Sequence, residues 1–549
     1  MFAAEDKAVQ PVRKRYLRLE PYKAPAKHFY LHSNPYCLYP ETYEQGGSGS
    51  DHHKGNFMLN GQTTGERANY QNIGLLLGPL FFAVILMLPV PEGLSPEAWK
   101  TVAIAAILAT WWATEAIPIP ATSLLPLVLL PVMGVGDSAS ASLPYARPVI
   151  FLLLGGFIAA MAMQKWELHR RIALNILARV GDHPYALIGG FMAASALLSM
   201  WISNTATTLM IVPIALTVAY TILGEKANGH RFTVALLIGC GWAASIGGLG
   251  TYIGTPPNLF VKGFIEQTTG REILFHEWMA FGIPVVLVMV PLAWAVLTRI
   301  CFPFEARLVQ GGSIIIQQEL SNLGAITKPE KRVAAVMITM ALMWSFRQVL
   351  VEWEALTNLL PFVERLKDMH IAVGAGLAMF LIPSGKQKRS GALLDWESAV
   401  TLPWGVILLF GGGLSLAAAI KTTGLALYLG HAMSGLATLP LFLLVLAVVA
   451  MITFLTELTS NTATTAAMVP VLGALATSAN LDPIFLAAPA AMAASCAFML
   501  PVATGPNAVI FSTGNVLVPQ MVRAGLWLNV LGTFVVAGIT YTILPLIFS

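Results

Sequence analysis

One polar hexapeptide, Ser-Asn-Thr-Ala-Thr-Thr, occurs twice in the chain, at 203–208 and at 460–465. Each copy interrupts an apolar stretch, 184–222 or 438–477, that is too long for a single membrane-crossing helix. Because Ser and Asn can end one helix and cap the next, each stretch is predicted to form a re-entrant hairpin with a polar tip. The free N–H groups of such a tip favour an oxyanion, and its free carbonyls suit a hard cation such as Na⁺. One tip can therefore bind an anion and a cation side by side.

A second element follows each hairpin, an apolar segment that stops at a Pro-Asn pair. The first runs at 245–258 and ends in Thr-Pro-Pro-Asn, and the second runs at 495–507 and ends in Thr-Gly-Pro-Asn. Proline inside a span frees carbonyls, and glycine lets the backbone approach a ligand closely. These segments are therefore predicted to be broken helices that meet the hairpin tips at one binding site near the middle of the membrane. The residues expected at the breaks are Gly254, Thr255, Ala503 and Thr504.

The order of these elements indicates an internal repeat. Gly155-Gly156 recurs as Gly411-Gly412 at an offset of 256 residues, the hexapeptide recurs at 257, and the Pro-Asn motif recurs at 249. Three ordered matches at nearly constant offset predict two repeats, and hairpins that open from opposite faces would make the repeat inverted, as in many secondary transporters. Three parts are therefore expected, the first of which is a cytoplasmic, mostly disordered tail (1–70). The first repeat (71–320) would contain scaffold helices, hairpin 184–222 and broken helix 232–266. The second repeat (321–549) would contain scaffold helices, hairpin 438–477 and broken helix 482–517.

Composition places these elements in a membrane. The 549 residues are 56% hydrophobic and only 11% charged, whereas soluble domains carry about 25% charged residues. The apolar runs are continuous rather than alternating, which excludes a β-barrel. The fold class is therefore predicted to be an all-α polytopic membrane protein with about 11 transmembrane helices plus two re-entrant hairpins. The expected spans lie near 72–90, 99–117, 119–135, 147–163, 232–250, 279–300, 332–350, 370–383, 400–420, 482–503 and 526–547.

Loop charges predict the orientation of the chain. The tail contains Arg13-Lys14-Arg15 and lacks the apolar core of a signal peptide. With the tail inside, the basic loops at 165–179, 299–332 and 386–389 also fall inside, as the positive-inside rule requires. We therefore expect a multi-pass protein of the plasma (inner) membrane, with its N-terminus in the cytoplasm and its C-terminus outside.

Signatures of other functions are missing from the sequence. It has no P-loop for ATP and no HExxH, GxSxG or paired-carboxylate motif, so we expect no enzyme and no catalytic residues. Its basic residues do not cluster with aromatic residues as in a nucleic-acid-binding protein. Two carboxylates, Glu115 and Glu457, fall within apolar runs, where a charged residue is a functional candidate. A helix-end contact accounts for Glu115 at least as well, and Glu457 could orient its tip or tune a cation site.

From about 72 to 549 the chain resembles the divalent anion/sodium symporter family, the Na⁺-coupled dicarboxylate and citrate carriers. The segments that carry the resemblance are LLSMWISNTATT (197–208), IGTPPN (253–258), FLTELTSNTATT (454–465) and ASCAFMLPVATGPNAVIFS (494–512). Gly505 stands where many members have Pro, and Thr459 stands where a small apolar residue is expected. The family also implies a homodimer, with a transport domain in each protomer that moves against a scaffold as an elevator.

The resemblance implies two Na⁺ sites with the substrate between the tips. The implied Na⁺ ligands are Ser199, Ser203, Asn204 and Gly254 in the first site and Thr456, Thr459, Asn461 and Ala503 in the second. The implied substrate contacts are Asn204, Thr205, Thr255, Ser460, Asn461, Thr462 and Thr504. Neither tip contains Lys or Arg, so bound Na⁺ would supply the positive charge that a carboxylate needs, which is the physical reason to expect coupling.

The favoured function is uptake of C4-dicarboxylates (succinate, malate, fumarate) or citrate, coupled to Na⁺ entry. A Na⁺-independent exchanger and a symporter of sulfate or another oxyanion are the alternatives within the same fold. A channel is disfavoured because a pore needs a continuous lined path, which two closed tips do not provide. A membrane enzyme would need a nucleophile paired with a base, and the sequence offers none.

Overall fold

The computed structural model describes residues 68–305, 312–385, 391–437 and 439–548. The expected disordered tail, 1–70, lies almost entirely outside the described residues. The described residues form helices joined by short connections, apart from one isolated β-bridge between Pro383 and Ala392. The predicted all-helical fold is therefore confirmed.

The helices follow the apolar runs of the sequence. Up to residue 322 they are α1 (Asn69–Met87), α2 (Pro96–Thr114), α3 (Ile119–Thr122), α4 (Leu125–Val132), α5 (Ser138–Ser142), α6 (Pro148–Lys165), α7 (Leu168–Leu177), α8 (Pro184–Ser199), α9 (Asn204–Leu223), α10 (Arg231–Gly247), the 3-10 turn η3 (Gly248–Gly250), α11 (Pro256–Thr269), α12 (Phe275–Ala295) and α13 (Gly312–Asn322).

Helices also follow the apolar runs in the rest of the described chain. The remaining helices are α14 (Lys328–Glu352), α15 (Glu354–Leu359), α16 (Asp368–Leu381), α17 (Trp396–Val400), α18 (Trp404–Thr422), α19 (Leu425–Ala432), α20 (Ser434–Ala437), α21 (Leu441–Thr456), α22 (Asn461–Ser478), α23 (Ile484–Ala494), α24 (Gly505–Ser512) and α25 (Val518–Phe548). Among the described residues, eight helices are long and apolar enough to cross a membrane, and α8, α16, α21 and α23 are among the shorter apolar ones.

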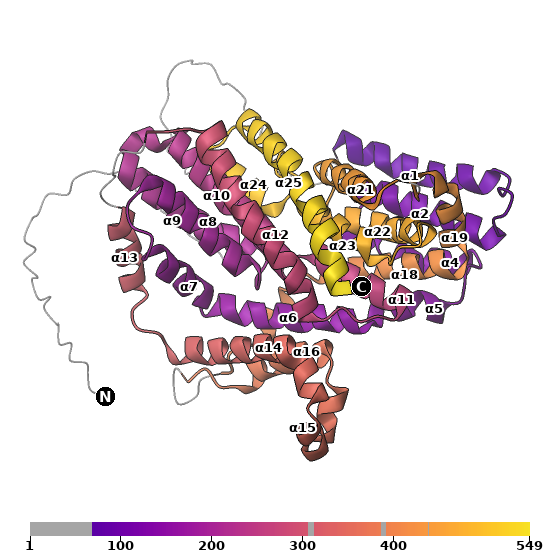
Figure 1. Ribbon diagram of the computed structural model, residues 1–549, viewed down its shortest axis with the longest axis horizontal. Coiled ribbons are helices and arrows are strands. Elements are labelled where there is room, and N and C mark those ends of the chain that lie inside the picture. The colour runs from indigo at the N-terminus through magenta and orange to yellow at the C-terminus, as the bar shows by residue number, and fades with distance from the viewer. Residues whose placement is uncertain (1–67, 306–311, 386–390, 438, 549) are drawn as a thin grey trace, which may run out of the picture. The chain divides into compact units, whose positions relative to one another are not determined.

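Both predicted hairpins are present (Figure 1). In the first, α8 ends at Ser199 and α9 begins at Asn204, with Ser203 as an extended N-cap whose hydroxyl accepts from the backbone N–H of Ala206. In the second, α21 ends at Thr456 and α22 begins at Asn461. A helix must stop at these tips because the cap residue adopts extended torsions that a continuous helix does not allow.

Both predicted broken helices are also present. The first consists of α10, η3 and α11, and the second consists of α23 and α24 with an irregular segment at 495–504 between them. Thr255 and Thr504 are the N-caps of α11 and α24, and both are extended, with φ of −142° and −141°. Proline follows within two residues in each case, where its fixed φ suits the first helical turn and no N–H is lost.

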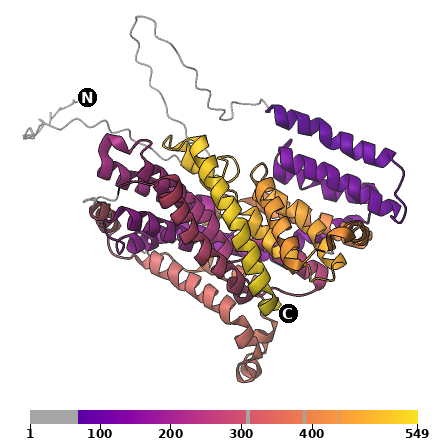
Figure 2. The ribbon, with the colours of Figure 1, turned by 45° about the horizontal axis from the view of Figure 1, so that its top comes forward.

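The hairpins and broken helices pack across the two halves of the chain. Besides packing on its own hairpin, α10 contacts α24, and α24 also contacts α9. In the same way, α11 contacts both α22 and α23. The most apolar window of α10 is completely buried within the protein. Two long helices, α12 and α25, lie side by side and contact α10 and α23 respectively (Figures 1 and 2). These contacts join helices of both hairpins and both breaks in one packed group.

Candidate functional site

At the first tip, a hydroxyl, an amide and a backbone carbonyl converge. Ser199 is fully buried at the end of α8, and its Oγ lies 2.5 Å from Oδ1 of Asn204, the first residue of α9. The same Oγ lies 2.5 Å from the backbone oxygen of Ala244, near the end of α10. The tip and the first broken helix therefore share this cluster of oxygens.

The second tip repeats this arrangement. The Oγ1 of Thr456, at the end of α21, lies 2.9 Å from Oδ1 of Asn461, the first residue of α22. It also lies 2.8 Å from the backbone oxygen of Ala494, the last residue of α23. Thr456 is fully buried. The correspondence is residue for residue, although Ser in the first half is replaced by Thr in the second.

Each cluster contains more acceptors than protons. A serine or threonine hydroxyl has one proton, and here it faces both an amide oxygen and a carbonyl oxygen. Oxygens of this kind, from hydroxyl, amide and backbone carbonyl, are the ligands that a hard cation takes. Glycine lines the first cluster as well, because a Cβ on Gly248 would come within 2.7 Å of Oδ1 of Asn204 and 3.2 Å of the Gly254 oxygen. Each cluster therefore presents the types of oxygen that a cation site needs.

The Pro-Asn motifs stabilise the breaks through their asparagines. The Nδ2 of Asn258 donates to the carbonyls of Gly248 and Thr251, at 3.1 and 2.9 Å. The Nδ2 of Asn507 donates to the carbonyls of Ala497 and Leu500, at 3.1 and 3.0 Å. Both asparagines are fully buried. Each amide thus satisfies two carbonyls that lose their helical partners where the helix stops.

Residues expected to contact the substrate lie where the two halves meet. The Oγ1 of Thr255 lies 3.4 Å from the Oγ of Ser495, a residue of the second break. A Cβ on Gly505 would come within 2.1 Å of Oγ1 of Thr205, so the glycine leaves room for the hydroxyl of the first tip. The absence of Pro at this position therefore has a packing reason, and α24 still begins at Gly505 with Thr504 as its cap.

Several expected residues make other contacts. The hydroxyl of Thr459 donates to the Leu455 carbonyl at 3.0 Å and also contacts the Thr464 hydroxyl, so its side chain does not join the Thr456–Asn461 cluster. Ser203 and Thr504 use their hydroxyls to cap α9 and α24, at 3.2 and 3.3 Å. A predicted role for these residues as ligands would therefore rely on their backbone oxygens or on the remaining lone pairs.

The remaining expected residues lie at or beside the tips and breaks. Ser460 is the N-cap of α22, and no side-chain cap bond is formed there. Thr462 is half-buried in the first turn of the same helix. Gly254 and Ala503 are buried one residue before the caps of α11 and α24, and Gly254 packs so closely on η3 that a Cβ would lie 2.5 Å from the Gly248 oxygen.

The two carboxylates within the apolar runs differ in solvent exposure and in their hydrogen-bond partners. Glu115 is exposed at the C-cap of α2, in the left-handed region with φ of 47°. Glu457 is buried beside the second tip. It accepts hydrogen bonds from three consecutive backbone N–H groups of the second break, at 498–500, and from Nδ2 of Asn529 in α25.

A buried charged network lies against the first break. The hydroxyl of Tyr252, two residues before Gly254, donates to Oδ2 of Asp368 at 2.8 Å. Asp368, at the start of α16, also pairs with Nε of Arg347 at 3.2 Å and with Nζ of Lys262 at 3.7 Å. Arg347 and Lys262 each reach Glu272 as well. Two cations and two anions balance within this group, and they attach the first break to α14 and α16.

Sequence reasoning missed part of the site. Asn258 and Asn507 were visible within the repeated Pro-Asn motif, but only their side-chain partners show that they stabilise the breaks. The carbonyls of Ala244 and Ala494 carry no side-chain signal, although both residues occur in the same local sequence, Ala-Ala-Ser. Asn529, the partner of Glu457, lies in a helix that no motif marked.

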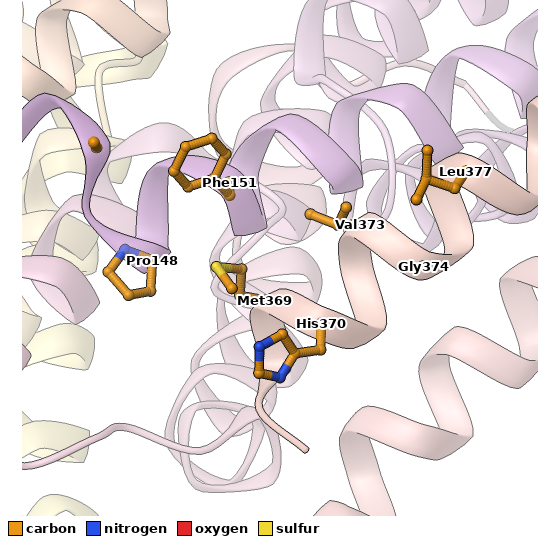
Figure 3. Close-up of a pocket in the computed structure, with 8 residues that line it drawn as sticks. Pro148, Phe151, Met369, His370, Val373, Gly374 and Leu377 are labelled. Atoms are coloured by element: carbon orange, nitrogen blue, oxygen red, sulfur yellow. The ribbon is translucent and has the colours of Figure 1, made fainter. Parts of the chain in front are cut away.

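One cavity in the described part of the chain is lined by none of these residues. A pocket of about 550 Å³ opens between α6 and α16 and is lined by Ala146, Pro148, Phe151, Met369, His370, Val373, Gly374 and Leu377 (Figure 3). His370 is its one polar side chain. A carboxylate requires several donors or a cation to replace its water, so this apolar pocket does not suit an anionic substrate.

Comparisons with known proteins identify the family of this chain. Residues 69–548 match the family described as the sodium:sulfate symporter transmembrane region. A sodium-dependent dicarboxylate transporter, SdcS of Staphylococcus aureus, is 40% identical over 87% of this chain and 92% of its own length. The chain belongs to the divalent anion/sodium symporter family. SdcS of Staphylococcus saprophyticus is also 40% identical, over 86% of this chain and 92% of its own length.

Solved structures share the fold at low sequence identity. MtrF of Neisseria gonorrhoeae, described in its title as one of a class of antimetabolite efflux pumps, is 15% identical, with a TM-score of 0.54 over 85% of this chain and 94% of its own. The YdaH transporter of Alcanivorax borkumensis is 14% identical, with a TM-score of 0.50 over 87% of this chain and 97% of its own. Both likenesses concern the fold alone. Membership of the symporter family confirms the predicted transporter class and the expectation that the protein is not an enzyme.

Proposed function

We propose that this member of the symporter family carries C4-dicarboxylates (succinate, malate, fumarate) or citrate into the cell together with Na⁺. The observation that carries the proposal is the pair of matching oxygen clusters, Ser199–Asn204–Ala244 and Thr456–Asn461–Ala494. The SdcS relatives are named as sodium-dependent dicarboxylate transporters. Their high coverage and identity favour the same coupling ion and substrate class here.

Charge is the physical reason for coupling. A dicarboxylate brings two negative charges to tips that contain no Lys or Arg. The half-helix N-termini at Asn204 and Asn461 offer N–H donors and a partial positive charge, which favours an anion by about 0.3–1 kcal/mol in exposed sites. A bound Na⁺ at each oxygen cluster would supply the rest. The substrate would then lie between the tips, on Asn204, Thr205, Thr255, Ser460, Asn461, Thr462 and Thr504.

Uptake into proteoliposomes tests this function. Labelled succinate should accumulate under an inward Na⁺ gradient and fall to background when K⁺ or choline replaces Na⁺. Labelled citrate in the same vesicles would distinguish the two substrate classes. Equal succinate uptake in all three salts, stimulated by succinate inside the vesicle, would instead establish a Na⁺-independent exchanger.

Sulfate transport is the second candidate, because the matching family is described as sodium:sulfate symporters. Sulfate is a compact dianion that needs donors close together, whereas succinate carries its two carboxylates at separate ends. The SdcS relatives, which are named as dicarboxylate transporters, favour the dicarboxylate here. Na⁺-dependent uptake of labelled sulfate that succinate does not inhibit would reverse this preference.

The remaining features of the proposal come from the family resemblance. We propose a homodimer whose protomers each move a transport unit against a scaffold, in the plasma membrane, with the N-terminus in the cytoplasm. The repeated hydrogen bonds of the hairpins and breaks support two repeats with the boundaries 71–320 and 321–549. Cross-linking of purified protein in lipid nanodiscs and accessibility labelling of single cysteines near either terminus would test the dimer and the orientation.

A further inference from the structure

The first tip meets the second break at a glycine. Helices α9 and α24 contact each other, and Gly505, the first residue of α24, faces Thr205 in the first turn of α9. A Cβ at position 505 would lie 2.1 Å from Oγ1 of Thr205 and 3.1 Å from both its Cβ and its Cγ2. The three nearest atoms thus all belong to one side chain. Gly505 forms a notch that this threonine fills.

Space, rather than backbone conformation, accounts for the glycine. Gly505 is not among the glycines of the described chain that have a positive φ, and it lies in a helix. Other residues adopt such a backbone readily, and proline is favoured at the first helical position. Pro256, the first residue of α11, occupies the corresponding place in the first break. The obstacle to a side chain at 505 is therefore Thr205.

The hydroxyl of Thr205 forms no hydrogen bond within the described part of the chain. Thr208, later in the same helix, uses its hydroxyl to bond back to the Asn204 carbonyl at 2.8 Å. For Thr205 the residue four positions earlier is Trp201, which lies in the tip and not in the helix. The proton and both lone pairs of the Thr205 hydroxyl are therefore available to a ligand.

The pair also borders open space. Thr205 is half-buried and Gly505 is exposed, whereas Thr255 and Ser495, at the other contact between the two halves, are both buried. A hydroxyl that is held on one side and open on the other can donate to a carboxylate without first leaving a protein partner. Thr205 is already one of the expected substrate contacts.

We propose that Gly505 is a positioning residue for the substrate, whose notch holds Thr205 in the orientation in which its hydroxyl donates to a substrate carboxylate. A threonine in a helix has two populated χ1 rotamers, and the notch selects one of them. A side chain at 505 would displace Oγ1, and the hydroxyl would turn away from the substrate. The inference rests on the proposed dicarboxylate transport. It makes the second break a determinant of what the first tip binds.

Gly505→Ala tests this role, because it adds one methyl group and keeps the backbone N–H that a proline would remove. We expect the succinate concentration for half-maximal Na⁺-driven uptake to rise about tenfold, as when a hydrogen bond to a charged group is lost. The maximal rate should recover at saturating succinate. Gly538→Ala in α25 is the control and should change neither quantity, because no atom lies within 4 Å of its Cβ position. A lower maximal rate with an unchanged half-maximal concentration would overturn the inference, since the glycine would then serve movement or packing.

A double variant separates positioning from general disturbance. Thr205→Ala removes the hydroxyl and should by itself raise the half-maximal succinate concentration about tenfold or more. It also removes Oγ1 and Cγ2, which leaves only Cβ, 3.1 Å from the added methyl group. When Thr205→Ala is present, Gly505→Ala should therefore change this concentration by less than about twofold further, because both substitutions act through one hydroxyl. Full additivity would mean that the glycine does not act through Thr205.

Na⁺ binding provides a second readout. The three atoms nearest to the added methyl group include none of the oxygens of the Ser199–Asn204–Ala244 cluster. The Na⁺ concentration that gives half of the maximal rise in melting temperature, measured on purified protein without substrate, should therefore be the same in Gly505→Ala as in the unmodified protein. A shift in this concentration as large as the shift for succinate would assign the glycine to the cation site and contradict the inference.

Thr205→Val decides the matter if Gly505→Ala yields too little folded protein for transport. This substitution keeps the notch and the shape of the side chain, and it replaces the hydroxyl by a methyl group. A rise of about tenfold in the half-maximal succinate concentration would support the inference, and a normal value would show that the hydroxyl is not needed and that the inference is wrong. If the unmodified protein does not accumulate succinate under a Na⁺ gradient, the proposed function itself fails, whatever the variants do.

Discussion

The hydroxyl of Thr255 and the hydroxyl of Ser495 lie 3.4 Å apart, although 240 positions separate them in the chain. Thr255 caps the helix that leaves the first break, and Ser495 is the first residue after α23 in the second. The contact joins the two breaks directly. A substrate held between the tips would meet both halves of the chain at this point.

The first prediction concerns this contact. Ser495→Ala should raise the succinate concentration for half-maximal uptake by roughly fivefold, because the hydroxyl of Thr255 loses a neighbour, and one neutral hydrogen bond contributes about 1 kcal/mol. Ser245→Ala is the matched control, since Ser245 occupies the same Ala-Ala-Ser position but its hydroxyl has no hydrogen-bond partner among the described residues. Equal effects of the two substitutions would show that the contact between the breaks has no role in substrate binding.

The second prediction concerns the two tip asparagines. Asn204→Ala and Asn461→Ala should each reduce uptake by about a hundredfold or more, because each removes an amide that meets the cation cluster and faces the substrate. Hydrogen bonds to charged groups contribute about 1.5–3 kcal/mol each. Thr208→Ala should cost far less, because that hydroxyl only bonds back to the Asn204 carbonyl at 2.8 Å. Initial uptake rates, corrected for the amount of monodisperse protein, measure the effect, and normal transport by either Asn variant would rule out a two-tip site.

The third prediction concerns the close approach of the backbone at the first break. Gly254→Ala would place a Cβ 2.5 Å from the Gly248 oxygen, and backbone atoms cannot move aside as a flexible side chain can. We expect the Na⁺-dependent rise in melting temperature to disappear. Gly538→Ala in α25 is the control, because no atom lies within 4 Å of its Cβ position. A normal Na⁺ response in Gly254→Ala would mean that this backbone geometry is not required for cation binding.

Local sequence signals were sufficient to predict the main elements of this fold. Apolar length marked the helices, and the Ser-Asn-Thr copies marked the tips, because a cap residue acts on the turn that immediately follows it. The Pro-Asn motifs marked the breaks for the same local reason. The first hairpin runs from Pro184 to Leu223, against the predicted 184–222, and the second runs from Leu441 to Ser478, against the predicted 438–477.

Contacts between distant residues could not be predicted in this way. The Lys262 and Asp368 pair, the Thr205 and Gly505 packing and the partners of Glu457 all depend on how helices far apart in sequence are placed. Residue type and period carry no information on such partners. The side chain of Thr459 shows the same limit, because its contact with Thr464 follows from the geometry of the tip rather than from the motif.

The fourth prediction concerns the buried network beside the first break. Asp368→Asn would leave Lys262 and Arg347 with Glu272 as their carboxylate, and removal of one partner from a buried ion pair costs about 3–5 kcal/mol. We expect a clear fall in melting temperature in detergent. Glu319→Gln is the control, because its pair with Arg170 is partly exposed, and such pairs contribute about 0–1 kcal/mol. Similar melting temperatures for both variants would show that the network is not under this electrostatic constraint.

The fifth prediction concerns the order of binding. A tip of hydroxyls and carbonyls is loosely held until a cation gathers its oxygens, so Na⁺ should bind first and raise the affinity for substrate. Thermodynamic linkage requires that substrate raise the affinity for Na⁺ by the same factor, and such coupling is typically about 1–3 kcal/mol, roughly 5–150-fold. Ser199→Ala removes the hydroxyl that lies 2.5 Å from both Asn204 and Ala244 while leaving the expected substrate contacts in place.

Ser199→Ala should therefore raise the Na⁺ concentration for half-maximal uptake, and saturating Na⁺ should largely restore the affinity for succinate. Titrations of succinate at several fixed Na⁺ concentrations separate the two effects. Thr456→Ala provides the comparison in the second half, where the same cluster is built on a threonine. Weaker succinate binding at every Na⁺ concentration, with an unchanged Na⁺ dependence, would place Ser199 in the substrate site or in packing instead, because a cation ligand acts on the substrate only through the cation.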